Sequence, residues 1–112
     1  MIHAEFARQT GQVLQYTAEL VENNQFAQAV AAFQAHNGKG INITVPFKQN
    51  AFQLAHELSP RAQRAGAVNT LVLRGANNYY GDTTDGVGLL NELTRNHQLP
   101  LQQKNILILG AR

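Results

Sequence analysis

The stretch GINITVPFK, residues 40–48, joins a β-branched run to a proline and a lysine. Isoleucine, threonine and valine favour strands, and proline cannot donate to a central ladder, so we expect a strand over 40–45 that Pro46 closes. Small and apolar residues then recur at helical spacing, which predicts a helix after the proline: Ala51, Leu54, Ala55 and Leu58. A strand that leads directly into a helix is typical of α/β domains.

The chain before this stretch alternates in a similar way. We expect a helix over 2–10 that stops at Gly11, a weak strand over 15–20 and an amphipathic helix over 25–36. The last helix has apolar side chains at the spacing i, i+3, i+4 and i+7, and an asparagine–glycine pair at 37–38 ends it.

The chain after residue 58 continues the alternation. The serine–proline pair at 59–60 is typical of an N-cap followed by a first-turn proline, and the short helix it opens should stop near Gly66. We expect a strand over 67–73, a turn over 75–78 and a returning strand at 79–80, which together form a hairpin.

Beyond the hairpin, the pattern predicts a helix over 85–97, with Val87, Leu90 and Leu93 facing inward, and a last apolar strand over 105–109. We therefore predict an α/β fold, in which a mostly parallel mixed sheet with one β-hairpin has helices on both faces.

The composition fits one small globular domain and excludes several classes of protein. The chain has 112 residues, 44% of them hydrophobic and 14% charged, and its net charge of +2 comes from scattered basic residues. Nucleic-acid binding would need a clustered basic face, and there are no cysteines to form disulfides or thiolate metal sites. The chain has no run of about 18 apolar residues and no signal-peptide pattern in its first residues. We expect no nucleic-acid or membrane partner and a cytoplasmic location.

Polar residues near the predicted strand ends are the candidates for a site, because α/β domains usually bind ligands there. Lys48 stands in the first turn of a helix, either as a solvated side chain or as an anion anchor and proton-transfer group. Asp85 opens another helix, where aspartate is usually a cap. Asn69 interrupts an apolar run, so its amide needs partners in a neighbouring loop or in a ligand. Thr44 suits a strand and needs no functional explanation.

Two other groups of residues carry weaker signals. Four histidines show no metal-ligand spacing, so we expect no metal site: His3, His36, His56 and His97. Gly110-Ala111 follows an apolar strand and is the kind of pair that opens a dinucleotide-binding fingerprint, although two residues of that motif are a weak signal.

Three motifs together resemble the substrate domain of the shikimate dehydrogenase family. They are NITVPFK at 42–48, AGAVNT at 65–70 and GDTTDGVG at 81–88, in the family's order and at its spacing. The helix expected over 2–10 is also similar to the first helix of the family, so the resemblance covers essentially the whole chain.

The resemblance implies an activity and a set of site residues. Members of this family reduce 3-dehydroshikimate to shikimate with NADPH, on the route through chorismate to the aromatic amino acids. By position, Lys48 and Asp85 match the catalytic lysine and its aspartate partner, and both also contact substrate. Thr44 and Asn69 match residues that bind the substrate's hydroxyls. This chemistry is consistent with the residue types, because reduction at a ring carbon requires proton transfer to the attached oxygen, and either Lys48 or Asp85 could move that proton.

The chain departs from the family pattern in three places. Thr83 stands where the family usually has asparagine, the family's opening strand and its carboxylate-binding serine loop have no counterpart, and 110–111 are not followed by further glycines. We therefore expect 1–103 to be a shikimate-binding catalytic domain that is incomplete at its N-terminus. Residues 104–112 would be the first strand of a truncated NADP-binding Rossmann domain.

The chain taken alone should bind no NADP, show no activity and bind shikimate or 3-dehydroshikimate weakly. Because the sheet would lack its first strand, unpaired strand edges should favour self-association. Two other hypotheses remain open. One is a quinate dehydrogenase relative, whose substrate carries one more hydroxyl, and the other is a non-catalytic binding module that retains only the substrate domain.

Overall fold

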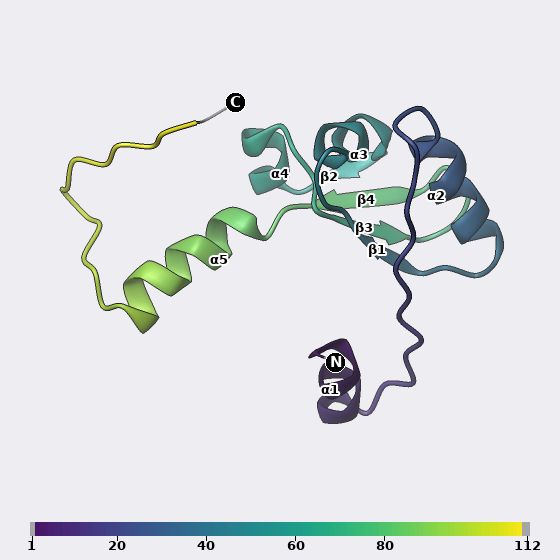
Figure 1. Ribbon diagram of the computed structural model, residues 1–112, viewed down its shortest axis with the longest axis horizontal. Helices are drawn as coiled ribbons and strands as arrows, with labels where there is room; N and C mark the ends of the chain where they lie inside the picture. The colour runs from purple at the N-terminus through teal and green to yellow at the C-terminus, as the bar shows by residue number, and fades with distance from the viewer. Residues whose placement is uncertain (1, 111–112) are drawn as a thin grey trace.

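The computed structural model describes residues 2–110 and shows one small sheet with α2, α3 and α4 beside it (Figure 1). In chain order the elements are α1 (Ile2–Thr10), α2 (Phe26–Ala35), β1 (Gly40–Asn42), α3 (Lys48–Leu54), β2 (Glu57–Leu58), α4 (Pro60–Ala65), β3 (Thr70–Leu73), β4 (Tyr79–Asp82), α5 (Asp85–Asn91) and the π-helical turn η1 (Glu92–Asn96). The predicted α/β class is confirmed. Within residues 2–110, no helix combines the length and the apolar character needed to cross a membrane.

The sheet has four strands in the order β1-β3-β4-β2. β1 runs antiparallel to β3, β3 runs antiparallel to β4, and β2 runs parallel to β4. The expectation of a mostly parallel sheet is therefore wrong for the described residues. The short turn at 75–78 forces β3 and β4 into a hairpin, and β1 joins the other edge of β3 in the opposite direction.

The strand β2 was not predicted from the sequence, because Leu58 continues the helical spacing of the preceding apolar residues. Leu58 lies one helical turn after Leu54, yet α3 ends at Leu54 and Leu58 pairs with Gly81 in the sheet. A Cβ added to Gly81 would lie 2.9 Å from a methyl group of Val68 and 3.0 Å from atoms of Ala55 and Leu58. The absence of a side chain at Gly81 thus lets β2 and its neighbours approach β4.

The hydrophobic core lies between one face of the sheet and the helices α2, α3 and α4. Its buried hydrophobic residues are Phe26, Val30, Ile43, Ala51, Ala62, Val68, Leu71, Leu73 and Tyr79. Phe26 also stacks on Phe47 with ring centroids 5.1 Å apart, which fixes α2 against the turn before α3. This core therefore supports the segment that carries Lys48.

Local signals set the ends of α4 as the sequence predicts. The Ser59 hydroxyl accepts a hydrogen bond from the Ala62 N–H at 3.1 Å, and Pro60 occupies the first turn. Gly66 ends the helix with a φ of 65°, a left-handed conformation that glycine adopts without a Cβ clash.

The two ends of the chain contribute little to the core: no residue of α1 or α5 is buried, and α5 extends away from the sheet (Figure 1). α1 reaches the sheet through His3, whose Nε2 lies 3.3 Å from the Asn42 Nδ2 at the end of β1. The strands expected over 15–20 and 105–109 do not form, because no strand of the described chain pairs with them. The inward face expected for the last helix is also wrong, since Val87 is 39% and Leu90 48% exposed.

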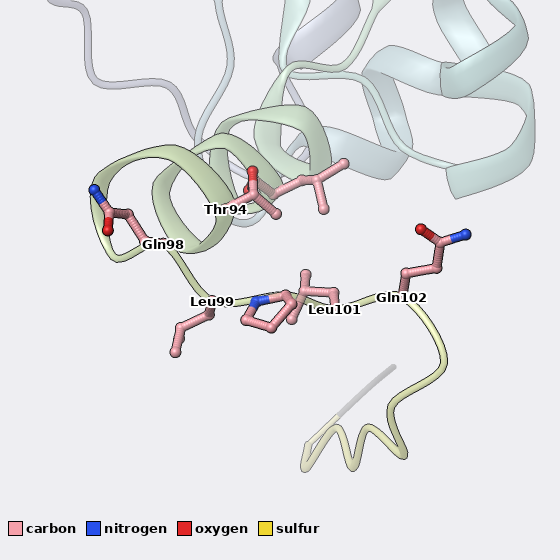
Figure 2. Close-up of a pocket in the computed structure, with 7 residues that line it drawn as sticks. Thr94, Gln98, Leu99, Leu101 and Gln102 are labelled. Carbon is pink, nitrogen blue, oxygen red and sulfur yellow. The ribbon is translucent and has the colours of Figure 1, made fainter.

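An open hollow lies between the end of this helical segment and residues 98–102 (Figure 2). Thr94 lines it from the helix, and Leu99 and Leu101 line it from the chain that turns back beneath. Its lining residues are uncharged, so it is distinct from the charged site described below.

The self-association of the chain that we expect through its unpaired strand edges remains a prediction.

Val68→Ala should destabilise the chain much more than Val72→Ala, because the same atoms are removed from a fully buried site and from one that is 40% exposed. Each buried methylene-sized group contributes about 0.8 kcal/mol and a residual cavity adds to the loss, so we expect about 2 kcal/mol for Val68 and about 1 kcal/mol or less for Val72. Urea unfolding measures both values. Equal losses would contradict the core assigned here.

Candidate functional site

The sheet register brings three separate segments to one end of the strands. Asn42, which ends β1, pairs with Thr70 at the start of β3, and Thr70 pairs with Asp82 at the end of β4. Residues 43–48 continue from β1 and residues 83–85 continue from β4. Polar residues that are distant in the sequence therefore meet beyond this end of the sheet.

Main-chain hydrogen bonds hold these segments in place. The Ile43 N–H donates to the Asn69 carbonyl at 2.7 Å, and the Asn69 N–H donates to the Asp82 carbonyl at 3.0 Å. The Val68 N–H donates to the Lys48 carbonyl at 3.0 Å. The backbone of the site is thus positioned by the sheet and its turns before any side chain contributes.

Lys48 and Asp85 form the central pair of the site. Lys48 is the first residue of α3 and Asp85 the first of α5, and the Lys48 Nζ lies 2.6 Å from the Asp85 Oδ2. Thr84 occupies the N-cap position of α5, so the Asp85 carboxylate is directed to the lysine instead of serving as the cap. The two side chains are 32% and 56% exposed, and a ligand can reach both from solvent.

Asn69 links this pair to the adjoining turn. Its amide Nδ2 donates to the Asp85 Oδ1 and to the Thr84 Oγ1, both at 2.9 Å. Its Oδ1 accepts from the Thr84 N–H at 3.2 Å and from the Thr70 Oγ1 at 2.9 Å. Of the two environments that the sequence left open for this amide, the structure places it against a neighbouring loop, beside the carboxylate.

Thr44 lies in the same region without joining this network. The residue is exposed, and its carbonyl accepts the Phe47 N–H at 2.9 Å in the turn that contains the cis Val45–Pro46 peptide. Its hydroxyl is not among the groups that bond to Lys48, Asn69 or Asp85 in the described chain. The structure thus brings Lys48, Asn69 and Asp85 into contact and leaves the Thr44 hydroxyl open to solvent.

The pair has a defined ionisation state. The hydrogen bond from Lys48, assisted by the one from Asn69 and by the lysine's charge, lowers the pKa of Asp85 below its ordinary value, against a smaller opposing effect of burial. The carboxylate is therefore charged at neutral pH, and it faces the Lys48 side chain at 2.6 Å.

A second charged cluster was not identified from the sequence. The Asp82 Oδ1 accepts from the Ser59 hydroxyl at 2.6 Å, from the Arg61 Nε at 2.7 Å and from the Thr83 N–H at 2.8 Å, and its Oδ2 accepts from the Arg61 Nη2 at 2.6 Å. The two-pronged bond from Arg61 is the main cause that holds the pKa of Asp82 far below its ordinary value, with Ser59 and the Thr83 N–H assisting. The only sequence signal was the place of Asp82 at a strand end, which does not identify an arginine 21 residues earlier.

Of the two residues proposed for cofactor binding, only Gly110 lies within the described residues. Gly110 is exposed with a φ of 84°, and Ala111 lies outside the described residues. A dinucleotide cradle requires a strand, a glycine turn and the start of a helix. Within the described chain, residues 105–110 form no paired strand.

An exposed ammonium, a carboxylate and an amide gather where strands end, the place at which α/β domains usually bind small molecules. The lysine and the amide donate hydrogen bonds and the carboxylate accepts them, a combination suited to a ligand rich in hydroxyl groups. The chain belongs to the shikimate dehydrogenase substrate binding domain family, whose model matches residues 1–71.

Curated relatives extend the similarity along the whole chain. The shikimate dehydrogenase (NADP(+)) of Saccharophagus degradans is 51% identical over 111 residues, which cover 99% of this chain and 40% of that protein. The shikimate dehydrogenase (NADP(+)) of Dechloromonas aromatica is 54% identical over 110 residues, covering 98% of this chain and 40% of that protein. The chain thus spans about 40% of the length of these relatives.

Solved structures share the fold. An Ael1 enzyme from Pseudomonas putida has a TM-score of 0.80 and 40% identity, over 89% of this chain and 36% of its own. Shikimate 5-dehydrogenase from Listeria monocytogenes, solved in complex with shikimate and NAD, has a TM-score of 0.76 and 31% identity, over 89% of this chain and 34% of its own. The order of strands and helices described above is therefore the fold of these enzymes over the matched part.

Asp82→Asn should reduce stability more at pH 7 than at pH 3. A carboxylate with a lowered pKa in the folded state stabilises the protein above the ordinary aspartate pKa, and this contribution is lost as the pH falls from about 5 toward the folded pKa. The variant should therefore show a shallower fall in the free energy of unfolding on acidification, measured by urea denaturation at both pH values.

Glu57→Gln is the matched control, because the Glu57–Arg74 pair is 3.2 Å long and largely exposed. Such a pair contributes little, so this variant should follow the unsubstituted chain at both pH values. The assignment of acid sensitivity to Asp82 fails if the two variants have the same pH dependence.

Proposed function

We propose that this chain is the substrate-binding part of an NADP-dependent shikimate dehydrogenase, which reduces 3-dehydroshikimate to shikimate on the route to aromatic amino acids. The observation that carries the proposal is the contact of Lys48 with Asp85 and Asn69 in a domain of this family. The relatives named shikimate dehydrogenase (NADP(+)) support the choice of substrate and reaction.

The four proposed substrate-binding residues offer complementary hydrogen-bonding groups to a hydroxylated ring. The Lys48 ammonium and the Asn69 amide are donors, the Asp85 carboxylate is an acceptor, and the Thr44 hydroxyl is both. The carboxylate is already held between two donors, so its orientation is set before substrate arrives. Such pre-organisation lowers the entropic cost of binding.

Lys48 is the proposed proton donor in ketone reduction. When the ring ketone becomes an alcohol, its oxygen must gain a proton from a group that holds one. Asp85 is ionised at neutral pH because its pKa is lowered, so it has no proton to give. The lysine is left as the donor, and the aspartate orients it through their contact at 2.6 Å. In the reverse direction the neutral lysine accepts the proton from the alcohol.

The 112-residue chain should bind shikimate weakly, with a dissociation constant in the millimolar range, through the residues named above. Hydrogen bonds to charged groups contribute roughly 1.5–3 kcal/mol each, so Lys48→Ala should weaken binding by about tenfold or more. Titration with shikimate, followed by amide chemical shifts in NMR, measures the affinity and locates the site.

Lys104→Ala is the matched control, because Lys104 lies in the C-terminal segment away from this network. It should bind shikimate as the unsubstituted chain does, and quinate should bind less tightly than shikimate. Equal affinities of the Lys48→Ala and Lys104→Ala variants would remove Lys48 from the binding site.

In a complete dehydrogenase that carries this substrate domain, Lys48→Ala should lower kcat far more than it raises KM. A general acid or base typically contributes about 10²–10⁴-fold, and its loss acts on the transition state. Asp85→Asn should lower kcat as well, and the double variant should be little worse than Lys48→Ala, because the two residues act as a unit.

Asn69→Ala provides the contrast in the same steady-state assay. If its amide serves mainly to hold ring hydroxyls, KM should rise more than kcat falls. A Lys48→Ala enzyme with normal kcat and altered KM alone would show that the lysine binds substrate and does not transfer the proton.

A further inference from the structure

The turn that carries Asp85 has little packing of its own. No residue of α5 is buried, and the Asp85 side chain is 56% exposed. Side chains packed around the helix therefore do not hold this carboxylate in place. Its position depends on its bonds to Lys48 and Asn69 and on the chain that leads into it from β4.

The segment that leads from β4 into Asp85 is held in place at Asp82, three residues before Asp85. One carboxylate oxygen of Asp82 accepts the N–H of Thr83, the first residue of the turn, at 2.8 Å and the Ser59 hydroxyl at 2.6 Å. Thr83 and Ser59 are 8% and 5% exposed, so both ends of this connection lie in the folded interior. Arg61 binds both carboxylate oxygens, at 2.7 and 2.6 Å.

We infer that Arg61 is a positioning residue for Asp85: by clamping Asp82, it fixes the turn at 83–84 so that the Asp85 carboxylate meets Lys48. Arg61 acts at a distance, because its hydrogen bonds go to Asp82 and not to the lysine–aspartate pair. The inference deepens the proposed function and rests on it for its catalytic meaning.

The choice of arginine follows from the geometry of the contact. Two parallel bonds from a planar guanidinium fix both the distance and the rotation of a carboxylate, whereas a lysine supplies the same charge without that fork. A fixed Asp82 carboxylate in turn fixes the direction of the Thr83 N–H. The next residue, Thr84, then donates its N–H to Asn69 at 3.2 Å, the amide that also holds Asp85.

The test is NMR on the 112-residue chain, with Arg61→Gln, Arg61→Lys and, as a control with the same loss of charge on the same helix, Arg64→Gln. Carboxyl-carbon titration reports the pKa values of Asp82 and Asp85, and hydrogen exchange reports protection of the Thr84 amide. Protection of the Val68 amide, which donates to the Lys48 carbonyl, shows that each variant is folded.

With Arg61→Gln, the pKa of Asp85 should rise toward that of an unpaired aspartate and the Thr84 amide should exchange faster. Arg64→Gln should change neither. Arg61→Lys retains the charge but loses the fork, so it should give intermediate values for both measurements. This result would separate geometric positioning from a simple effect of charge.

The inference is overturned if Arg61→Gln raises the pKa of Asp82 alone and leaves Asp85 and the Thr84 amide unchanged. If that variant loses protection at Val68, Arg61→Lys decides by the same criterion. Failure of the proposed function would be seen separately, as an absence of shikimate-induced shifts in the unsubstituted chain, because the two readouts require no substrate.

Discussion

The hydrogen bonds of Asn69 are the constraint on which the sheet and the site both depend. Its main chain bonds to Ile43 on one side and to Asp82 on the other, where β1, β3 and β4 meet. Its side chain bonds to Thr84 and Asp85 in the turn beyond β4. An apolar residue here would leave the turn without these partners, and unpaired polar groups at partly buried positions are costly. One residue thus couples the strand register to the position of the carboxylate.

The Arg61–Asp82 and Lys48–Asp85 ion pairs differ in exposure and in the kind of basic residue. The chemistry of each basic residue suits the role assigned to its pair. Arg61 holds the less exposed Asp82 through a planar fork, which suits a fixed structural contact. Lys48 meets the more exposed Asp85 as a compact charge on a flexible stem, which suits a group that can exchange partners and protons. Asp82 ends β4 and Asp85 begins α5, so the two contacts lie three residues apart on one segment of the chain.

Features set by neighbouring residues were predictable from the sequence, and features set by distant contacts were not. The cap at Ser59, the stop at Gly66 and the hairpin turn at 75–78 depend on a few adjacent residues, and all three form as expected. Leu58 fitted a helical pattern equally well, and only its pairing with Gly81 makes it a strand residue.

The site shows the same limit. Motif resemblance identified Lys48, Asn69 and Asp85, which the structure brings together. The clamp of Arg61 on Asp82 spans 21 residues and has no local signature. The apolar run at 105–109 has the composition of a strand, but a strand also requires a neighbour, and the described chain supplies none.

The mutual neutralisation of Lys48 and Asp85 has a consequence for selectivity among metabolites. A lone exposed lysine at the start of a helix would attract phosphates and carboxylates of many kinds. Here its charge is already matched at 2.6 Å, so a simple anion gains little and is repelled by the carboxylate. Neighbouring hydroxyl groups on a ring can instead offer an acceptor to the ammonium and a donor to the carboxylate at the same time. In the proposed site, the pair would thus disfavour small free anions that approach Lys48 and favour ligands with vicinal hydroxyl groups.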